Sequence, residues 1–202
     1  MKQIMFAMSL LAGLVSITHA AGNAAAGKTK SAACAACHNA DGNSSANPLW
    51  PKLAGQHQKY IAKQLKDFKA GKTRRDPLMA GMVAALSEQD MADLGAYFES
   101  QTRKLGRADK KLVTLGEKVY RGGNATTGVA ACIACHGPTG AGNAAAGFPA
   151  IGGQHAAYSS KALNDFKSGA RSNDPNKMMR DIAGRMSDDE IKAVSDYIGG
   201  LH

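Results

Sequence analysis

The chain has 202 residues and a formal net charge of +9, and 5% of its residues are aromatic. All four cysteines lie in two short motifs, which leaves none for a disulfide framework. A basic charge can indicate nucleic-acid binding, but the N-terminal export pattern described next argues against a nucleic-acid partner.

Residues 1–20 have the pattern of a secretory signal peptide. A positive charge at Lys2 precedes an apolar run over residues 4–17, and a Thr-His-Ala sequence then ends at Ala20. The run is too short to span a bilayer comfortably, and the small residues after it are typical of a cleavage site. We expect cleavage after Ala20 and a mature protein in the periplasm. The alternative is an uncleaved signal that serves as a membrane anchor.

The pattern C-x-x-C-H occurs twice, and it is the attachment sequence of c-type haem. In such a motif the two thiols bond to the porphyrin, and the following His ligates the iron. The sequence therefore predicts two covalently bound haem c groups. The residues concerned are Cys34, Cys37 and His38 in the first copy and Cys132, Cys135 and His136 in the second.

Two other kinds of cysteine site fit the motifs less well. Zinc sites of four cysteines have about 15–20 residues between the two pairs, whereas Cys37 and Cys132 are much farther apart. A zinc site also gives no reason for a His after each pair. A thioredoxin-like motif needs a strand–helix unit, and the sequence has no convincing strand pattern.

The sequence contains a tandem repeat of one unit. Many residues recur at an offset of 98, and the offset becomes 100 beyond Asn176-Lys177, where the second copy is two residues longer. This register predicts two domains, 21–100 and 112–202, joined by a linker, 101–111, that has five basic residues and one acidic residue. The linker is interpreted either as a solvated segment or as a surface that steers acidic partners.

The spacing of apolar residues predicts that each half of the chain is helical. Apolar residues have helical spacing in 60–68, before Gly71, and again in 158–166, before Gly169. Ser87 and Ser187 begin capping boxes, and apolar helix faces follow. We predict an all-α fold, in which each half has an N-terminal helix with the haem motif, a middle helix and a C-terminal helix.

The repeat also indicates the second iron ligand. Met79 aligns with Met179, in the loop before the capped last helix, and thioether sulfur is a known axial ligand of haem iron. His57 and His155 also match, and they are alternative ligands or hydrogen-bonding residues. The remaining methionines near these positions align with Ile or Leu and are interpreted as packing residues: Met82, Met91, Met178 and Met186.

Both halves resemble class I c-type cytochromes, and the chain as a whole is similar to the dihaem cytochromes c4. The resemblance rests on the two haem motifs, on Pro51-Lys-Leu-Ala-Gly-Gln56 and Pro149-Ala-Ile-Gly-Gly-Gln154, and on the last helix with Asp196-Tyr-Ile-Gly199. It implies His/Met ligation of each iron and a proline carbonyl that accepts a hydrogen bond from each ligand His. We expect Pro51 and Pro149 in that role, with Pro48 as a competitor in the first half and Met178 as a competitor of Met179.

These features predict an electron carrier rather than an enzyme, because an iron with both axial positions filled has no site for a small-molecule substrate. The resemblance implies single-electron transfer between respiratory proteins, such as a terminal oxidase. We expect redox partners that are acidic or membrane-bound, and a monomer or a loose dimer. The alternatives are a dihaem peroxidase and a haem subunit of a dehydrogenase complex.

Overall fold

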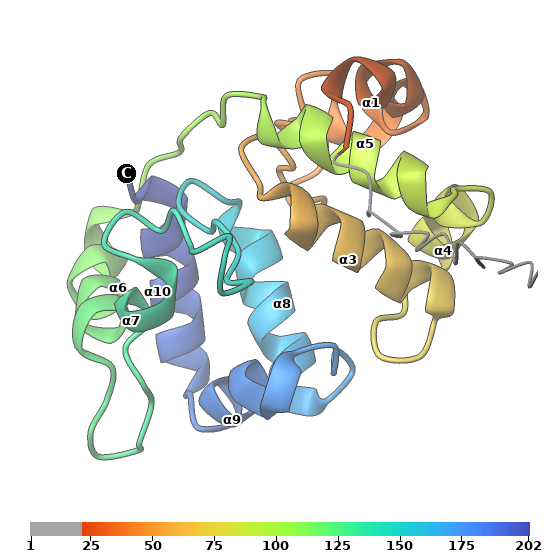
Figure 1. Ribbon diagram of the computed structural model, residues 1–202. Helices are drawn as coiled ribbons and strands as arrows, with labels where there is room; N and C mark the ends of the chain where they lie inside the picture. Colours follow the sequence, from red (N-terminus) through yellow and green to blue (C-terminus); the bar gives the residue numbers. More distant parts are fainter. Residues whose placement is uncertain (1–21) are drawn as a thin grey trace, which may run out of the picture.

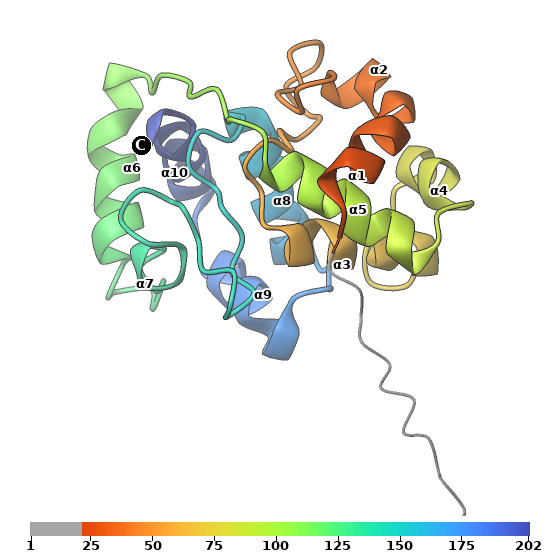
Figure 2. The same ribbon diagram turned by 45° about the horizontal axis from the view of Figure 1, so that its top comes forward.

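The protein consists of two helical domains in sequence, as predicted. The computed structural model describes residues 22–202, so the expected signal peptide lies outside the described residues. In this range the regular elements are helical, and β-structure is limited to isolated bridges. Figures 1 and 2 show the domains side by side, with α3 of the first and α8 of the second toward their common boundary. The same part of the chain has no helix long and apolar enough to cross a bilayer.

The helices follow the same order in both domains. The first domain contains α1 (Ala24–Lys30), α2 (Ala35–His38), α3 (Gln58–Ala70), α4 (Pro77–Val83) and α5 (Glu88–Glu99). The second contains α6 (Lys110–Gly122), α7 (Ile133–His136), α8 (Ala156–Ser168), α9 (Met178–Gly184) and α10 (Asp188–Gly200). Short 3₁₀ turns precede α2 (Ser31–Ala33) and α9 (Pro175–Lys177).

Local sequence signals set the helix ends. Both predicted capping boxes are present: the Ser87 hydroxyl accepts from the amide of Asp90 at the start of α5, and Ser187 accepts from Glu190 at the start of α10. Helices α3 and α8 end at glycines in the left-handed conformation, with φ of 63° at Gly71 and 79° at Gly169. A glycine accepts this conformation without the steric cost of a Cβ atom.

The terminal helices of each domain pack against each other through a glycine. Gly27 of α1 lies against α5, where a Cβ atom would stand 2.0 Å from the Asp93 carbonyl oxygen. Gly116 of α6 lies against α10, where a Cβ atom would stand 2.4 Å from the Ala193 carbonyl oxygen. Because the backbones touch at these points, the larger side chains beside them form the two cores. Phe98 and Leu94 belong to the first core, and those of the second include Tyr120, Ile191, Val194 and Ile198.

The structure differs from the sequence expectation at three places. Met79 and Met179 lie on the short helices α4 and α9 rather than in loops, because Asp76 caps α4 by accepting from the Met79 amide at 3.1 Å. In the second domain α6 is separated from α7 by a loop that contains an isolated bridge between Asn124 and Val129. Helix α6 also begins at Lys110, inside the stretch expected to be linker.

The glycine crossing gives a first prediction. Gly116→Ala places a methyl group against the α10 backbone, so we expect a loss of about 1–3 kcal/mol in the free energy of unfolding. Gly122→Ala in the same helix is the matched control, since a Cβ atom there meets nothing within 4 Å. It should be neutral or slightly stabilising, because alanine favours helix over glycine. Denaturant unfolding followed by circular dichroism measures both, and equal stability of the two variants would contradict the packing argument.

Candidate haem sites

Each C-x-x-C-H motif folds into a single helical turn that brings its reactive side chains together. In the first domain the His38 amide donates to the Cys34 carbonyl at 2.9 Å, and in the second the His136 amide donates to Cys132 at 2.9 Å. Cysteines three residues apart lie on one face of such a turn. All four thiols are free and partly exposed, whereas the His side chains are buried. The thiols are therefore accessible to a large group, whereas the imidazoles are enclosed by the protein.

A backbone carbonyl fixes the orientation of each imidazole. His38 Nδ1 lies 2.9 Å from the Pro51 carbonyl oxygen, and His136 Nδ1 lies 3.0 Å from that of Pro149. A carbonyl can only accept, so Nδ1 carries the proton and Nε2 is left as the metal-binding nitrogen. Burial lowers the pKa of both rings, and the bond to proline opposes this shift only in part. Both rings are thus neutral near pH 7, the state that ligates iron.

The cysteines lie in apolar surroundings. Burial, aided by the neighbouring Cys37, raises the pKa of the Cys34 thiol, and burial raises that of Cys132 to about 11. Both shifts favour the protonated thiol. Apolar surroundings of this kind fit an apolar macrocycle.

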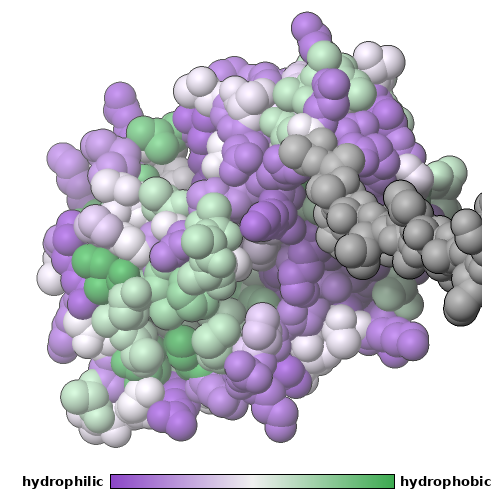
Figure 3. Space-filling view, viewed as in Figure 1, coloured by the Kyte–Doolittle hydropathy of each residue, from purple (hydrophilic) through white to green (hydrophobic). Residues whose placement is uncertain are grey.

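Partly buried hydrophobic side chains surround each motif, as a haem requires. In the first domain Cys34, Leu53, Leu65 and Leu86 pack against the core while remaining partly exposed. In the second domain the same holds for Cys132, Ile133, Leu163 and Ile182. Figure 3 shows apolar residues gathered over the second domain around α7 and α9 of Figure 1, on a face that is otherwise mostly polar. The residues present therefore fit a haem in each domain.

The methionines fall into distinct groups. Met91 and Met186 are 2% and 3% exposed, so they are packing residues. Met79 and Met179 are partly buried, while their neighbours Met82 and Met178 are more exposed, at 44% and 37%. An aspartate anchors each short helix: Asp76 holds the Met79 amide, and Asp174 accepts from the Arg180 amide at 3.0 Å and from its Nε at 2.7 Å.

The matched histidines open the middle helices but have different partners. His155, at the N-cap of α8, has Nε2 2.7 Å from the Ser44 carbonyl oxygen of the other domain. His57, at the N-cap of α3, has Nδ1 3.6 Å from Glu99, and its buried Nε2 has no hydrogen-bond partner. The contact of His155 is thus the carbonyl contact that its sequence context allowed.

Two glutamines connect the domains beside the haem loops, a role that the sequence did not reveal. Gln56 donates to the Ala150 carbonyl at 2.8 Å and accepts from the Ala150 amide at 2.9 Å. Gln154 makes the matching pair with Lys52, at 3.0 and 2.9 Å. Ala150 and Lys52 directly follow the prolines whose carbonyls contact His136 and His38. Each domain therefore supports the proline loop of the other.

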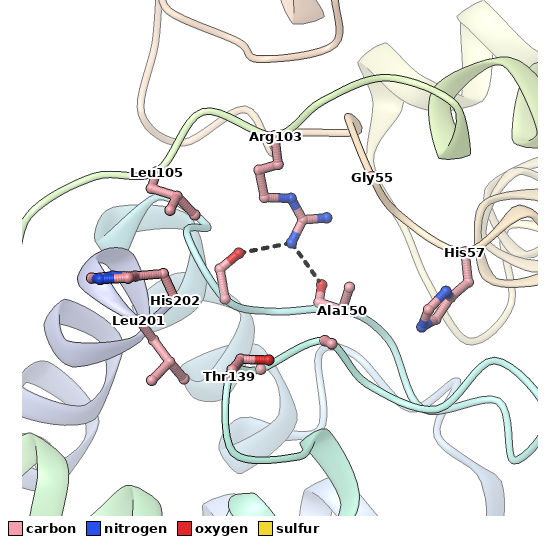
Figure 4. Close-up of a pocket in the computed structure, with 11 residues that line it drawn as sticks. Gly55, His57, Arg103, Leu105, Thr139, Ala150, Leu201 and His202 are labelled. Carbon is pink, nitrogen blue, oxygen red and sulfur yellow. Dashed lines mark hydrogen bonds between the residues drawn. The ribbon is translucent and has the colours of Figure 1, made fainter.

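Part of the basic linker is internal to the boundary between the domains. Arg103 Nε donates to the Ala54 carbonyl at 2.7 Å, and Nη1 donates to Ala150 and Gly152 at 3.2 and 2.9 Å. Figure 4 shows the two hydrogen bonds of Nη1, to the carbonyls of Ala150 and Gly152, at a depression of about 530 Å³ that Leu105 and His57 also line. Burial lowers the pKa of Arg103 to about 10, so the group is still charged at neutral pH.

Comparison with known proteins agrees with this geometry. The sequence profile of the cytochrome c family matches residues 24–102 and again 114–202. A cytochrome c4 of Pseudomonas aeruginosa is 50% identical over the full length of both chains. A thiosulfate dehydrogenase electron acceptor of Stutzerimonas stutzeri is 39% identical over 84% of this chain and 79% of its own.

A solved structure has the same arrangement of domains. The crystal structure of reduced recombinant cytochrome c4 from Pseudomonas stutzeri superposes with a TM-score of 0.87 at 50% identity, covering 90% of this chain and 100% of its own. Together with the two attachment motifs, these matches establish two covalently bound haem c groups, at Cys34/Cys37 and at Cys132/Cys135. The chain belongs to the cytochrome c family and, within it, to the dihaem cytochromes c4, which are electron-transfer proteins.

Proposed function

We propose that this protein carries single electrons between redox proteins of the periplasm, with His38 and Met79 as axial ligands of one iron and His136 and Met179 as those of the other. The observation that carries the proposal is the matched pair of sites. Each domain has a neutral, buried His with a free Nε2 and, at the repeat-related position, a partly buried Met on a short anchored helix. When bound, each haem supplies an iron that changes its charge by one unit.

The residues of the chain hold the haem in a fixed environment. Two thioether bonds per haem prevent its dissociation, and the carbonyls of Pro51 and Pro149 hold the His rings in one tautomer. A sulfur ligand opposite each His raises the reduction potential and leaves no open coordination position. The site therefore favours transfer of an electron over binding of a substrate.

The partners that this proposal implies are proteins. Respiratory donors and acceptors, among them a terminal oxidase, fit a basic carrier, which attracts acidic or membrane-bound redox partners. The full chain has a net charge of +9, and loss of Lys2 with the signal peptide leaves +8. One relative is named as the electron acceptor of thiosulfate dehydrogenase. We therefore include enzymes that oxidise sulfur compounds among the proposed electron donors. We infer that the protein works as a monomer or a loose dimer.

The proposed architecture of the precursor has four parts. Residues 1–20 are a signal peptide, 21–100 and 112–202 are cytochrome c domains, and 101–111 is the linker between them. Since haem attachment requires export in bacteria that carry such proteins, cleavage and haem loading belong to the same compartment. A dihaem peroxidase and a haem subunit of a dehydrogenase are the competing functions, and the carbon monoxide experiment below tests the first of them.

Replacing the proposed methionine ligands tests the sites directly. Met79→His and Met179→His should each remove about half of the Met–iron charge-transfer absorbance of the oxidised protein, and the double variant should remove all of it. The same changes should lower the potential of the haem concerned, because His ligation stabilises ferric iron. Met82→Leu and Met178→Leu are the controls, since these neighbours are more exposed. An unchanged spectrum in Met79→His would refute the assignment.

Carbon monoxide distinguishes a carrier from a peroxidase-type enzyme. If both irons have two protein ligands, the reduced protein should show no rapid change in its Soret band when carbon monoxide is added, and redox titration should show two one-electron steps. Met79→His and Met179→His should also resist binding, because they keep six ligands. Fast binding at one haem of the unaltered protein would support an enzyme with an open iron position.

The mass and the cellular location of the mature protein test the proposed export. Expression of the full chain in a bacterium with haem attachment machinery should give periplasmic protein whose mass corresponds to residues 21–202 plus two haems. A Lys2→Glu change should reduce export, because the positive n-region orients the signal peptide. A mature chain that retains residue 1 and fractionates with membranes would instead indicate an anchor.

A further inference from the structure

An arginine and a histidine line the depression beneath the linker, and each leaves one nitrogen without a partner. Within residues 22–202 three buried side-chain polar atoms have no hydrogen-bond partner, and two of them are Arg103 Nη2 and His57 Nε2. Both residues line the depression of about 530 Å³, which we call the linker depression. Figure 4 shows Nη2 as the guanidinium nitrogen on the side of His57. Buried polar atoms are seldom left unpaired, so two of them at one depression indicate a ligand.

Both domains and the linker build this depression. Its other lining residues include Leu105 of the linker and Thr139, Ala150, Gly152 and Leu201 of the second domain. His57 stands at the N-cap of α3, whereas Arg74, which donates to the Tyr158 hydroxyl across the boundary at 2.8 Å, follows the opposite end of that helix. Because α3 has 13 residues, it is about 20 Å long. The linker depression and the contact of Arg74 are therefore separate parts of the boundary.

Positive charge gathers at the linker depression without a carboxylate to balance it. Within the described part of the chain, Arg103 and the buried Lys52 donate to backbone carbonyls and form no ion pair. Exposed Lys104, by contrast, is paired with Asp41 at 2.8 Å. Burial lowers the pKa of Lys52, and the charges of Arg103 and Lys104 lower it further. Cations enclosed in this way are costly unless an anion accompanies them.

The two unpaired nitrogens have the chemistry to hold an oxyanion. A guanidinium can only donate, and Nη1 and Nε of Arg103 are already bonded to carbonyls, so Nη2 is the nitrogen left for a ligand. His57 Nδ1 lies 3.6 Å from a carboxylate oxygen of Glu99. In its cationic form the ring donates from both nitrogens, toward Glu99 through Nδ1 and toward a ligand through Nε2. Hydrogen bonds between such cations and an oxyanion are short and strong.

We propose that the linker depression binds one small inorganic oxyanion of the sulfate and phosphate class, held by Arg103 Nη2 and His57 Nε2. Water alone would pair the two nitrogens but would leave the charges of Arg103 and Lys52 unbalanced. The depression has room for the ion together with water. The proposal depends on the docked arrangement of the domains and not on the axial ligands or the redox partners, so it stands or fails separately from the proposed function.

The expected role of the ion is to stabilise the docked pair of domains. The ion contacts the first domain through His57 and the linker through Arg103, which is itself bonded to carbonyls of both domains. The complete site therefore exists only while the domains are docked. A ligand that binds only this form stabilises it by mass action. The midpoint of thermal unfolding should accordingly rise with sulfate concentration.

The test titrates the dihaem holoprotein with sodium sulfate by calorimetry, with the ionic strength held constant by sodium chloride. The buffer has a pH of about 6, at which the cationic form of an ordinary histidine is well populated. We expect saturable binding of one sulfate per chain. Arg103→Gln and His57→Ala should each weaken the affinity on the order of tenfold, because each removes a charged hydrogen bond. The rise in the thermal midpoint with sulfate should shrink in the same two variants.

Two matched controls separate a built site from general attraction. Arg107→Gln removes an exposed arginine of the same linker and should change the affinity by roughly twofold or less. His155→Ala removes the histidine at the matching N-cap of α8, which lies outside the depression and has the Ser44 carbonyl as its partner. It should leave sulfate binding in place. If Arg103→Gln does not fold, His57→Ala decides alone, because this side chain caps no helix amide.

The remaining outcomes each overturn the proposal. Absence of saturable binding would show that solvent alone completes the two nitrogens. Binding that survives both Arg103→Gln and His57→Ala would place the sulfate elsewhere on the chain, and an equal loss in Arg107→Gln would show diffuse attraction. An acetylated pentaglutamate peptide provides the last arm. Peptide binding that is tighter than sulfate binding, and that is lost in Arg103→Gln, would assign the depression to acidic side chains of a protein partner instead of an inorganic ion.

Discussion

The hydrogen bond from the His of each haem motif to a proline carbonyl is the interaction on which the geometry of both sites depends, and the opposite domain supports it. His136 donates to Pro149, and Gln56 of the first domain holds both backbone groups of the next residue, Ala150. Gln154 does the same for Lys52, which follows the Pro51 that holds His38. A loop held at adjacent residues by its own domain and by the other has little freedom to shift. The orientation of each imidazole is therefore a property of the assembled pair of domains.

This mutual support is not fully symmetric. Lys52 is 7% exposed and directs its ammonium group to carbonyls, including that of Gly153 at 2.9 Å, whereas the matching position in the second domain is Ala150. Burial, together with Arg103 and Lys104, lowers the pKa of Lys52. The linker adds Arg103 on the same side of the boundary. The two proline loops thus differ in fixed charge although the His–proline hydrogen bond repeats in both domains.

The sequence predicted the elements whose signals are local. Capping boxes at Ser87 and Ser187 and left-handed glycines at the ends of α3 and α8 depend on neighbouring residues, and all are present.

The conformation of other segments depends on tertiary contacts. The pentapeptide Asn-Ala-Ala-Ala-Gly starts α1 at Asn23 but forms a turn closed by a bridge from Asn143 to Phe148. In the first case α5 lies against the helix, and in the second Gly147 has φ of 77°. The hydrogen bonds of Arg74 and Arg171 to tyrosines of the opposite domain were equally hidden, because the repeat aligns Arg74 with Ser172 and Arg171 with Thr73.

The net charge of +9 is not all on the surface, because several basic residues lie at the boundary between the domains. From the sequence, the linker charge suggested a solvated segment or a surface that steers partners. In the structure Arg103 is bonded to carbonyls of both domains, Lys52 is buried beside it, and Arg74 and Arg171 lie at another part of the same boundary. Buried charges are screened by salt less than exposed lysines are. Part of the basic character is therefore enclosed at the boundary between the domains, and the attraction of acidic partners depends on the exposed remainder.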